Sequence, residues 1–156
     1  MTALRGHGFD GRRIGWWVAL VLWLGVIWGH STMPATDSAK ESLFIVDLIR
    51  GWLAPLGITD THLMDHIVRK AAHFNEYAAL AALVTKAFDT RRADGGAWKG
   101  LVPLAVLWVM APCVDETIQL FTPGRAGMVR DVLLDMCGFA TGVAVMLRRH
   151  LQHISA

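Results

Sequence analysis

Four apolar runs dominate the pattern of hydrophobic and polar positions along the chain. Each approaches the roughly 20 residues that an α-helix needs to cross a bilayer. The second run is the weakest, because Asn75, Glu76 and Lys86 interrupt it, but its alanines and leucines recur at helical spacing. The pattern predicts an all-α integral membrane protein, a bundle of four transmembrane helices in one domain, residues 1–156. The predicted spans are residues 14–29, 70–88, 101–121 and 131–147.

A shorter amphipathic stretch lies between the first two runs. Residues 41–54 place large apolar side chains, including Phe44 and Trp52, on one wide face. This pattern is typical of a short helix lying in the membrane interface, although a simple cap over the bundle would share it. Thr59 or Asp60 then offers a natural N-cap for the helix that leads into the second span.

Composition supports a membrane protein. Hydrophobic residues make up 54% of the chain and charged residues 18%, against about a quarter charged in a typical soluble domain. The net charge of +2 and the lack of a basic cluster interleaved with aromatic residues argue against nucleic-acid binding. The chain has no G-x-S-x-G, P-loop or C-x-x-C motif, so nucleophilic-serine and nucleotide-driven chemistry find no support.

The distribution of Lys and Arg predicts the orientation. Nine of these residues fall on the side of the two termini and six on the other side. The positive-inside rule then places both termini in the cytoplasm, and residues 30–69 outside. Arg5, Arg12 and Arg13 before the first run also fit a cleavable signal peptide. The four Trp of this first run and the lack of a small-residue cleavage site after it favour an uncleaved helix.

Ionisable groups on three of the spans fall at one depth. Counting about 1.5 Å of rise per residue places them roughly 6–11 Å below the outer surface. They are His73 and Glu76 on the second span, Asp115 and Glu116 on the third, and Asp135 on the fourth. A charged side chain at the centre of a membrane costs roughly 2.5–3.5 kcal/mol. We therefore expect these groups to surround a polar chamber open to the outer face.

The residue types suggest roles in this chamber. The candidates for proton transfer are His73, Glu76, Asp115 and Glu116. The substrate-binding candidates supply cations, neutral hydrogen-bonding groups and further acids: Lys70, Tyr77, Gln119, Arg125, Arg130, Asp131 and Asp135. At least one of the cations should pair with an acid, and Arg125 with Asp115 is the first choice. Arg125, at the tip of a turn, should contribute little to packing.

Simpler interpretations exist for several of these residues. Asp131 fits an N-cap of the fourth span, and Arg130 fits a boundary cation that reaches toward water. His73 and Glu76 form an H-x-x-E pattern that, with Asp115 and Asp135, resembles a metal site, as does the pair His62 and His66, but nothing fixes four ligands. No metal or other cofactor is therefore expected. Cys113 and Cys137 are interpreted as small packed thiols, and Gly138 and Gly142 as a point of close helix approach.

Two segments, KAAHFNEYAALAALV (70–84) and DETIQLFTPGRAGMVRDVLLDMCGFATG (115–142), resemble the VanZ-like family of small bacterial membrane proteins. The positions that match its motifs are Lys70, His73, Glu76, Tyr77, Asp115, Glu116, Gln119, Phe121, Gly124, Arg125, Asp131 and Gly138. Asp135 departs from the pattern, in which Asn is commoner. The founding member is linked to teicoplanin resistance. The resemblance thus implies a bacterial cytoplasmic membrane protein that acts at the outer envelope face.

These observations lead to one main functional expectation. The polar site should recognise or process an anionic lipid, a lipid-linked glycan or a lipoglycopeptide-type amphiphile at the outer leaflet. Whether the site catalyses a reaction is left open. If it does, the reaction would proceed by acid–base catalysis by His73 and a neighbouring carboxylate. The alternatives are a non-catalytic structural scaffold and, less favoured, a proton-coupled transporter. The expected partner is a membrane lipid or lipid-linked envelope intermediate, with a membrane-protein partner or a second copy left open.

Overall fold

The computed structural model describes residues 11–57, 59–88 and 98–154, which form five α-helices and one short 3₁₀ helix. In chain order these are α1 (Gly11–Ser31), α2 (Ala35–Leu53), η1 (Ala54–Leu56), α3 (Thr61–Ala87), α4 (Trp98–Leu120) and α5 (Val129–Ile154). The all-helical architecture is therefore as predicted. Arg91 and Arg92, which entered the charge count, lie outside the described residues, as does Arg5.

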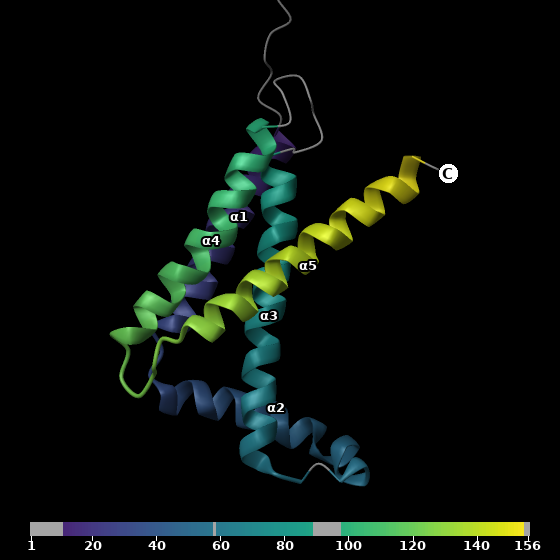
Figure 1. Ribbon diagram of the computed structural model, residues 1–156. Coiled ribbons are helices and arrows are strands. Elements are labelled where there is room, and N and C mark those ends of the chain that lie inside the picture. Colours follow the sequence, from purple (N-terminus) through teal and green to yellow (C-terminus); the bar gives the residue numbers. More distant parts are fainter. Residues whose placement is uncertain (1–10, 58, 89–97, 155–156) are drawn as a thin grey trace, which may run out of the picture.

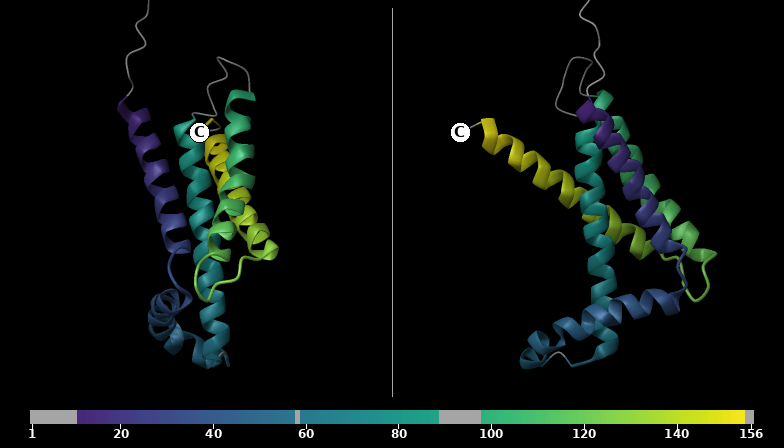
Figure 2. Two further views of the ribbon diagram at one scale, coloured as in Figure 1. Left: turned by 90° about the vertical axis from the view of Figure 1, so that its left-hand side faces the viewer. Right: turned by 180° about the vertical axis from the view of Figure 1, so that it is seen from behind.

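Helix α3 is the centre of the arrangement, since it packs against α1, α2, α4 and α5. Helices α1 and α4 run in one direction along it, and α5 crosses it obliquely (Figure 1). Helix α2 lies across the end of α3 that extends beyond the other helices, as both views in Figure 2 show. The ends of α1 and α4 and the beginning of α5 therefore meet on one side of α3, above α2.

The apolar core lies where α1, α3, α4 and α5 meet. Its buried members are Leu20, Ile27, Tyr77, Leu80, Ala81, Val84, Ala87, Ala111 and Phe139. Two tryptophans on α1 add directed contacts between helices. The Trp23 indole N–H donates to the backbone oxygen of Glu76 at 3.0 Å, and that of Trp28 donates to Ala111 O at 3.5 Å. These bonds fix the end of α1 against α3 and α4.

Two glycines allow α5 to approach α3 closely. A Cβ atom added at Gly138 would collide with the backbone carbonyl of Phe74, and one added at Gly142 would collide with that of Ala78. Small residues four positions apart are the usual means by which two membrane helices bring their backbones together. The close approach predicted for these glycines is confirmed, and it places Asp135, one turn earlier on α5, beside His73.

The boundaries of several elements differ from the predicted ones. Helix α3 begins at Thr61, nine residues before the predicted span, and Asp60 caps it by accepting bonds from the His62 and Leu63 amides at 2.9 and 3.3 Å. Helix α2 begins at Ala35 rather than at residue 41, and α5 continues past residue 147 to Ile154. The N-cap interpretation of Asp131 is wrong. Its amide donates to Met128 O at 2.9 Å, so Asp131 lies inside the first turn of α5.

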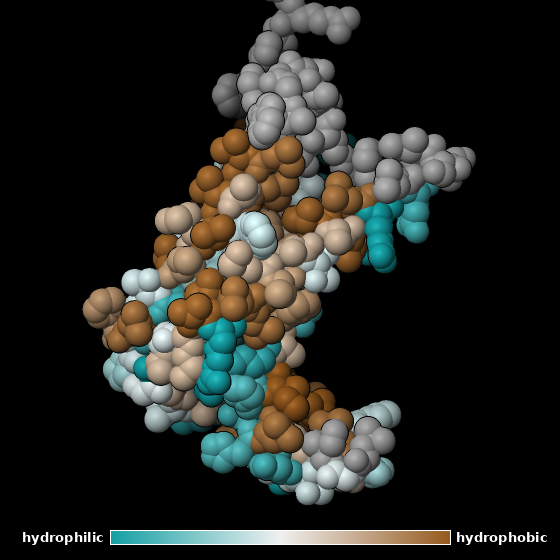
Figure 3. All heavy atoms as spheres, in the orientation of Figure 1, coloured by the Kyte–Doolittle hydropathy of each residue, from teal (hydrophilic) through white to brown (hydrophobic). Residues whose placement is uncertain are grey.

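Within the described residues, two helices are long and apolar enough to cross a membrane: α1 (Gly11–Ser31) and the Leu101–Leu120 part of α4. Many of their large apolar side chains are exposed, among them Val21, Leu22, Val102 and Val106. In Figure 3 hydrophobic residues cover much of the half of the molecule built around α4, and hydrophilic residues gather toward the α2 end. This division is typical of a protein whose apolar part faces lipid and whose polar end lies in or near water. The number of helices that cross the membrane stays a prediction.

Candidate functional site

The end of α1 is joined to the loop between α4 and α5 by a set of backbone-directed bonds. Thr122 Oγ1 donates to the Ser31 carbonyl oxygen at 2.8 Å, and the Ala35 amide donates to Pro123 O at 3.1 Å. Arg125 donates from Nε to Met33 O at 3.0 Å and from Nη2 to His30 O at 3.1 Å. These contacts hold the corner between α1 and α2 against the 121–128 loop, above the polar groups of α3 and α4.

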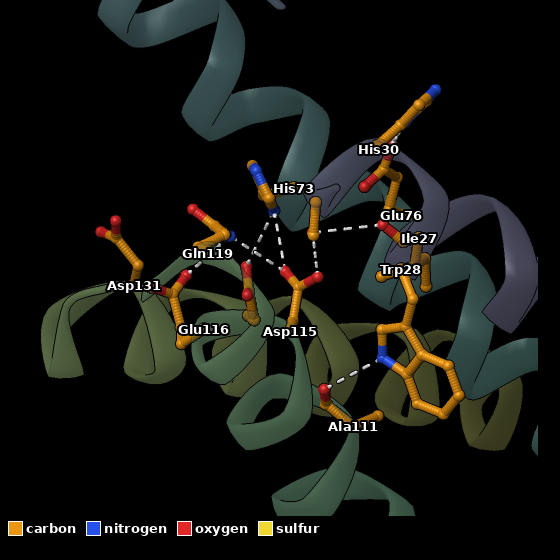
Figure 4. A network of polar contacts seen from close by, with 12 residues as sticks. Ile27, Trp28, His30, His73, Glu76, Ala111, Asp115, Glu116, Gln119 and Asp131 are labelled. Carbon is orange, nitrogen blue, oxygen red and sulfur yellow. Dashed lines mark hydrogen bonds and ion pairs between the residues drawn. The ribbon is translucent and has the colours of Figure 1, made fainter. Parts of the chain in front are cut away.

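Below this corner, three helices bring His73, Asp115 and Asp135 together. Nδ1 of His73 lies 3.6 Å from Asp115 Oδ2 and 3.9 Å from Asp135 Oδ1. Asp115 and Asp135 are 0% and 1% exposed, and His73 is partly buried. Figure 4 shows His73 and Asp115 pointing toward one another from α3 and α4. We call these three residues the floor of the site.

Asp115 and Glu116 are both fixed by neighbouring donors. Ser31 Oγ donates to Asp115 Oδ1 from the last residue of α1. Gln119 Nε2 donates to Glu116 Oε1 at 3.1 Å and approaches Asp115 Oδ2 at 3.4 Å. Glu116 also accepts a bond of 2.7 Å from the Met128 amide at the start of α5. Each acid therefore links α4 to another segment, and their orientations are set by these bonds.

Glu76 and Tyr77 do not join the floor, although both are predicted to line the polar chamber. Glu76 Oε1 lies 3.0 Å from His30 Nδ1 on α1, at the side of the site (Figure 4). Tyr77 is fully buried in the core, and its hydroxyl has no hydrogen-bond partner among the described residues. Of the four candidates for proton transfer, His73 and Asp115 are thus in the floor, whereas Glu76 and Glu116 flank it.

A cavity of about 460 Å³ opens above the floor. It is bounded by the ends of α1 and α4, by α2 and α3, by the 121–128 loop and by the start of α5. His73 and Asp135 line it, together with four cations: Arg69, Lys70, Arg125 and Arg130. The predicted polar chamber therefore exists as a cavity, and its residues come from segments far apart in the sequence.

The four cations differ in what already neutralises them. Lys70 Nζ forms an ion pair of 2.5 Å with Asp131 Oδ2, and Arg69 lies 3.7 Å from Asp65. In the part of the chain that the structure describes, Arg125 and Arg130 have no ion pair with an acid. Partial burial, followed by the nearby charge of Arg69, lowers the pKa of the Arg125 guanidinium below its ordinary value. The expectation that some cation pairs with an acid is met by Lys70 and Asp131.

Two expectations about Arg125 are wrong. It does not pair with Asp115; within the described residues its hydrogen bonds go to the carbonyl oxygens of His30 and Met33. The expectation that Arg125 contributes little to packing is also wrong, because those bonds hold the α1–α2 corner. The physical reason is the turn: Gly124 has φ 74°, and the chain at Arg125 folds back over α1.

Sequence reasoning missed His30 and Ser31, which contact Glu76 and Asp115 from α1. The signal was present, since both residues end the first apolar run at the depth of the other polar groups. The interpretation of Cys113 and Cys137 as packed thiols is also wrong: both are free and exposed. They lie on faces of α4 and α5 that no neighbouring helix of the described chain covers, where a small apolar thiol suits lipid.

Comparisons with known proteins agree with the motifs. The family model described as VanZ/LLP1 matches residues 16–150, which include every helix that contributes to the site. No curated protein and no solved structure shows significant similarity to the chain. The family match and the two long apolar helices indicate a membrane protein. Since the match spans most of the sequence, the chain belongs to the VanZ/LLP1 family.

Proposed function

We propose that the cavity binds the anionic headgroup of a membrane lipid or lipid-linked amphiphile. The observation that carries this proposal is a headgroup-sized cavity whose lining combines four Lys and Arg side chains with five acids, and in which Arg125 and Arg130 have no ion pair with an acid of the described residues. It lies beside a helix with exposed aromatic and aliphatic residues. Pockets of about 300–1,000 Å³ are typical of small-molecule sites. A ligand with a charged head and an apolar tail satisfies both features.

The charged end of the ligand would meet Arg125 and Arg130. Arg130 is exposed at the start of α5, and Arg125 spends two of its donors on backbone oxygens. A guanidinium has five N–H donors in a planar fork, so Arg125 keeps donors for a phosphate or carboxylate. Lys70 already pairs with Asp131 and would contribute by exchanging that partner.

The apolar end of the ligand would lie along α2. Phe44 and Trp52 on this helix are 72% and 82% exposed, while Val46 on the opposite side is buried. Ser42 donates to Asp65 on α3 and fixes this rotation of the helix. A helix with one apolar face of this kind lies in the membrane interface and contacts acyl chains. Helix α2 would thus guide the tail while the cavity holds the head.

For this to work, the cavity must face the outer leaflet. We assign α1, α3, α4 and α5 to four spans, with both termini in the cytoplasm and α2 on the extracytoplasmic side of a bacterial cytoplasmic membrane. Helices α1 and α4 run opposite to α3 and α5, as this orientation requires (Figure 1). The charged residues of α3 and α5 face one another in the site, which supports their passage through lipid.

Cysteine labelling of intact cells tests the orientation. The chain first needs Cys113→Ser and Cys137→Ser, because both native thiols are exposed. A membrane-impermeant maleimide should then modify Asp60→Cys and spare Ala93→Cys. The reverse pattern would turn the cavity toward the cytoplasm and exclude an outer-leaflet ligand.

The binding proposal has a matched pair of variants on one helix. Arg130 and Arg149 are both exposed cations of α5, but only Arg130 lines the cavity. Native mass spectrometry of the detergent-purified protein would compare phosphatidylglycerol with phosphatidylcholine of the same chains. Arg130→Gln should weaken phosphatidylglycerol binding by about 10-fold, the value of one charge-assisted hydrogen bond. Arg149→Gln should leave it unchanged.

Two outcomes would replace this proposal with a structural scaffold. One is equal binding of the anionic and zwitterionic lipids by the native chain. The other is equal effects of Arg130→Gln and Arg149→Gln.

The floor also offers His73 beside two carboxylates, the groups that an acid–base step on a bound headgroup would use. Mass spectrometry of lipids that co-purify with the native chain and with His73→Gln would reveal a product or an accumulated substrate.

A further inference from the structure

We propose that His73, Asp115 and Asp135 bind a divalent transition-metal cation, of the Zn²⁺ or Mn²⁺ class, at the floor of the cavity. One imidazole nitrogen and two carboxylate oxygens from three different helices converge there, all within 4.8 Å of one another. The inference does not rest on the proposed binding of a lipid headgroup, and it would hold if the cavity had another ligand.

The distances between the three side chains suit ligands of one cation better than direct bonds. Nδ1 of His73 is 3.6 Å from Asp115 Oδ2 and 3.9 Å from Asp135 Oδ1, beyond the range of a normal hydrogen bond. Ligand atoms about 2.1 Å from a tetrahedral Zn²⁺ lie about 3.4 Å apart. The two distances from His73 exceed this by about 0.2 and 0.5 Å, which small side-chain rotations remove.

The second observation is that Asp135 has no hydrogen-bond partner among the residues that the structure describes. It is 1% exposed, and neither of its oxygens accepts a hydrogen bond from the described residues. The His73 Nδ1 atom beside it is also buried and accepts or donates no hydrogen bond within that part of the chain. Native proteins leave few buried polar groups unsatisfied, and an unpaired carboxylate is among the costliest. Lys70, one turn from His73 on α3, already forms an ion pair with Asp131. A bound cation would satisfy both groups at once.

The surroundings hold the ligands in place, as outer contacts do in metal sites. Asp115 accepts a hydrogen bond from the Ser31 hydroxyl on Oδ1, and its Oδ2, which also accepts from Gln119 at 3.4 Å, is directed at His73. On the other side, the close packing of Gly138 against the Phe74 backbone positions Asp135. The three helices are therefore braced at the point where the ligand atoms meet.

The donor set selects the class of metal. Nitrogen with carboxylate oxygen suits Zn²⁺, Mn²⁺ or Fe²⁺, whereas Mg²⁺ favours sites built of oxygen alone. Three protein ligands also leave coordination positions free, and His73 and Asp135 line the open cavity from which water or a ligand oxygen would reach them. His62 and His66 are a weaker candidate, because no carboxylate of the described chain joins them in a cluster.

Metal analysis of the protein purified without a histidine tag tests this site. Zn²⁺ or Mn²⁺ should be present, or should bind after chelation, in an equimolar amount by plasma mass spectrometry and titration calorimetry. Asp135→Asn keeps the shape of the side chain and should weaken binding by at least about 100-fold, since even outer contacts are worth 10- to 100-fold. Asp47→Asn, the same change at an exposed acid of α2 that does not line the cavity, is the matched control and should retain binding. His62→Ala should retain it as well.

Thermal unfolding adds a readout that loss of fold cannot imitate. Without metal, Asp135→Asn should be as stable as the native chain or more stable, because it removes a buried charge. Added metal should raise the Tm of the native chain and leave that of Asp135→Asn unchanged. The inference is overturned if the native chain binds no more metal than Asp135→Asn, or if Asp47→Asn or His62→Ala loses the metal equally. If Asp135→Asn does not fold, the same comparison is made with His73→Gln. The metal measurements do not depend on lipid binding, so the metal site would stand even if Arg130→Gln did not change lipid binding.

Discussion

Replacing Gly138 with alanine should separate α5 from α3 and disturb the floor of the site. The added Cβ would collide with the carbonyl oxygen of Phe74, and the next contacts are the C and Cα atoms of the same residue at 3.0 and 3.1 Å. These are backbone atoms of a packed helix, so no side chain can rotate to make room. The helix itself must move.

Two opposing effects set the size of the change. Overpacking a tight interior costs about 1–3 kcal/mol, and a backbone contact belongs at the upper end of that range. Alanine is favoured over glycine inside a helix by about 1 kcal/mol. The net loss for Gly138→Ala should therefore be about 2 kcal/mol. Gly25→Ala, on α1, is the control: it has nothing within 4 Å of its added Cβ, so only the favourable helix effect of up to about 1 kcal/mol remains.

The assay is unfolding of the detergent-solubilised protein by titrated SDS, followed by circular dichroism and tryptophan fluorescence. Gly138→Ala should unfold at a lower SDS fraction than the native chain, and Gly25→Ala at an equal or higher one. Metal or lipid binding should fall with Gly138→Ala, because Asp135 moves with α5. If Gly138→Ala proves as stable as Gly25→Ala, the close backbone packing inferred for these helices is wrong.

Three further predictions concern the polar contacts. Ser31→Ala removes the donor to buried Asp115 and should cost about 1–3 kcal/mol of unfolding free energy in the same SDS titration, whereas Ser38→Ala in the cavity wall should cost less. Arg125→Ala should cost about 2 kcal/mol through its two bonds to carbonyl oxygens, and Arg125→Lys should recover only part of this; full stability of the alanine variant would contradict a structural role for these bonds. A double-mutant cycle with Lys70→Met and Asp131→Asn should give a coupling of about 1 kcal/mol, since both side chains keep some exposure, and strict additivity would refute the pair.

The convergence of His73, Asp115 and Asp135 could be predicted because it depends on few physical quantities. Helical rise fixes the depth of each residue in its span, and the cost of burying charge requires the acids to face inward. The glycine pair on α5 supplied the packing face. These rules act along single helices and do not depend on the loops, so the residue pattern brings the three residues to one layer. The same rules also place Glu76 and Glu116 in that layer, and only the structure separates them from the floor.

The contacts that sequence reasoning missed depend on where the chain turns. Glu76 lies on nearly the same face of α3 as His73, and its pairing with His30 follows from the length of α1. Arg125 binds main-chain oxygens, which every residue possesses, so no side-chain pattern identifies its partners. The early start of α2 was missed because residues 35–40 are mostly polar and show no apolar face.

Helix α3 has a mechanical consequence under the proposed orientation. Its 27 residues run without a break and span about 40 Å, whereas the hydrocarbon core of a bilayer is about 30 Å thick. The helix cannot shorten, so it keeps α2 at a constant height above the cytoplasmic boundary. In a thicker bilayer the cavity mouth therefore sinks toward the acyl chains, and in a thinner one it rises toward water. Bilayer thickness thus sets which part of a neighbouring lipid molecule stands level with the opening.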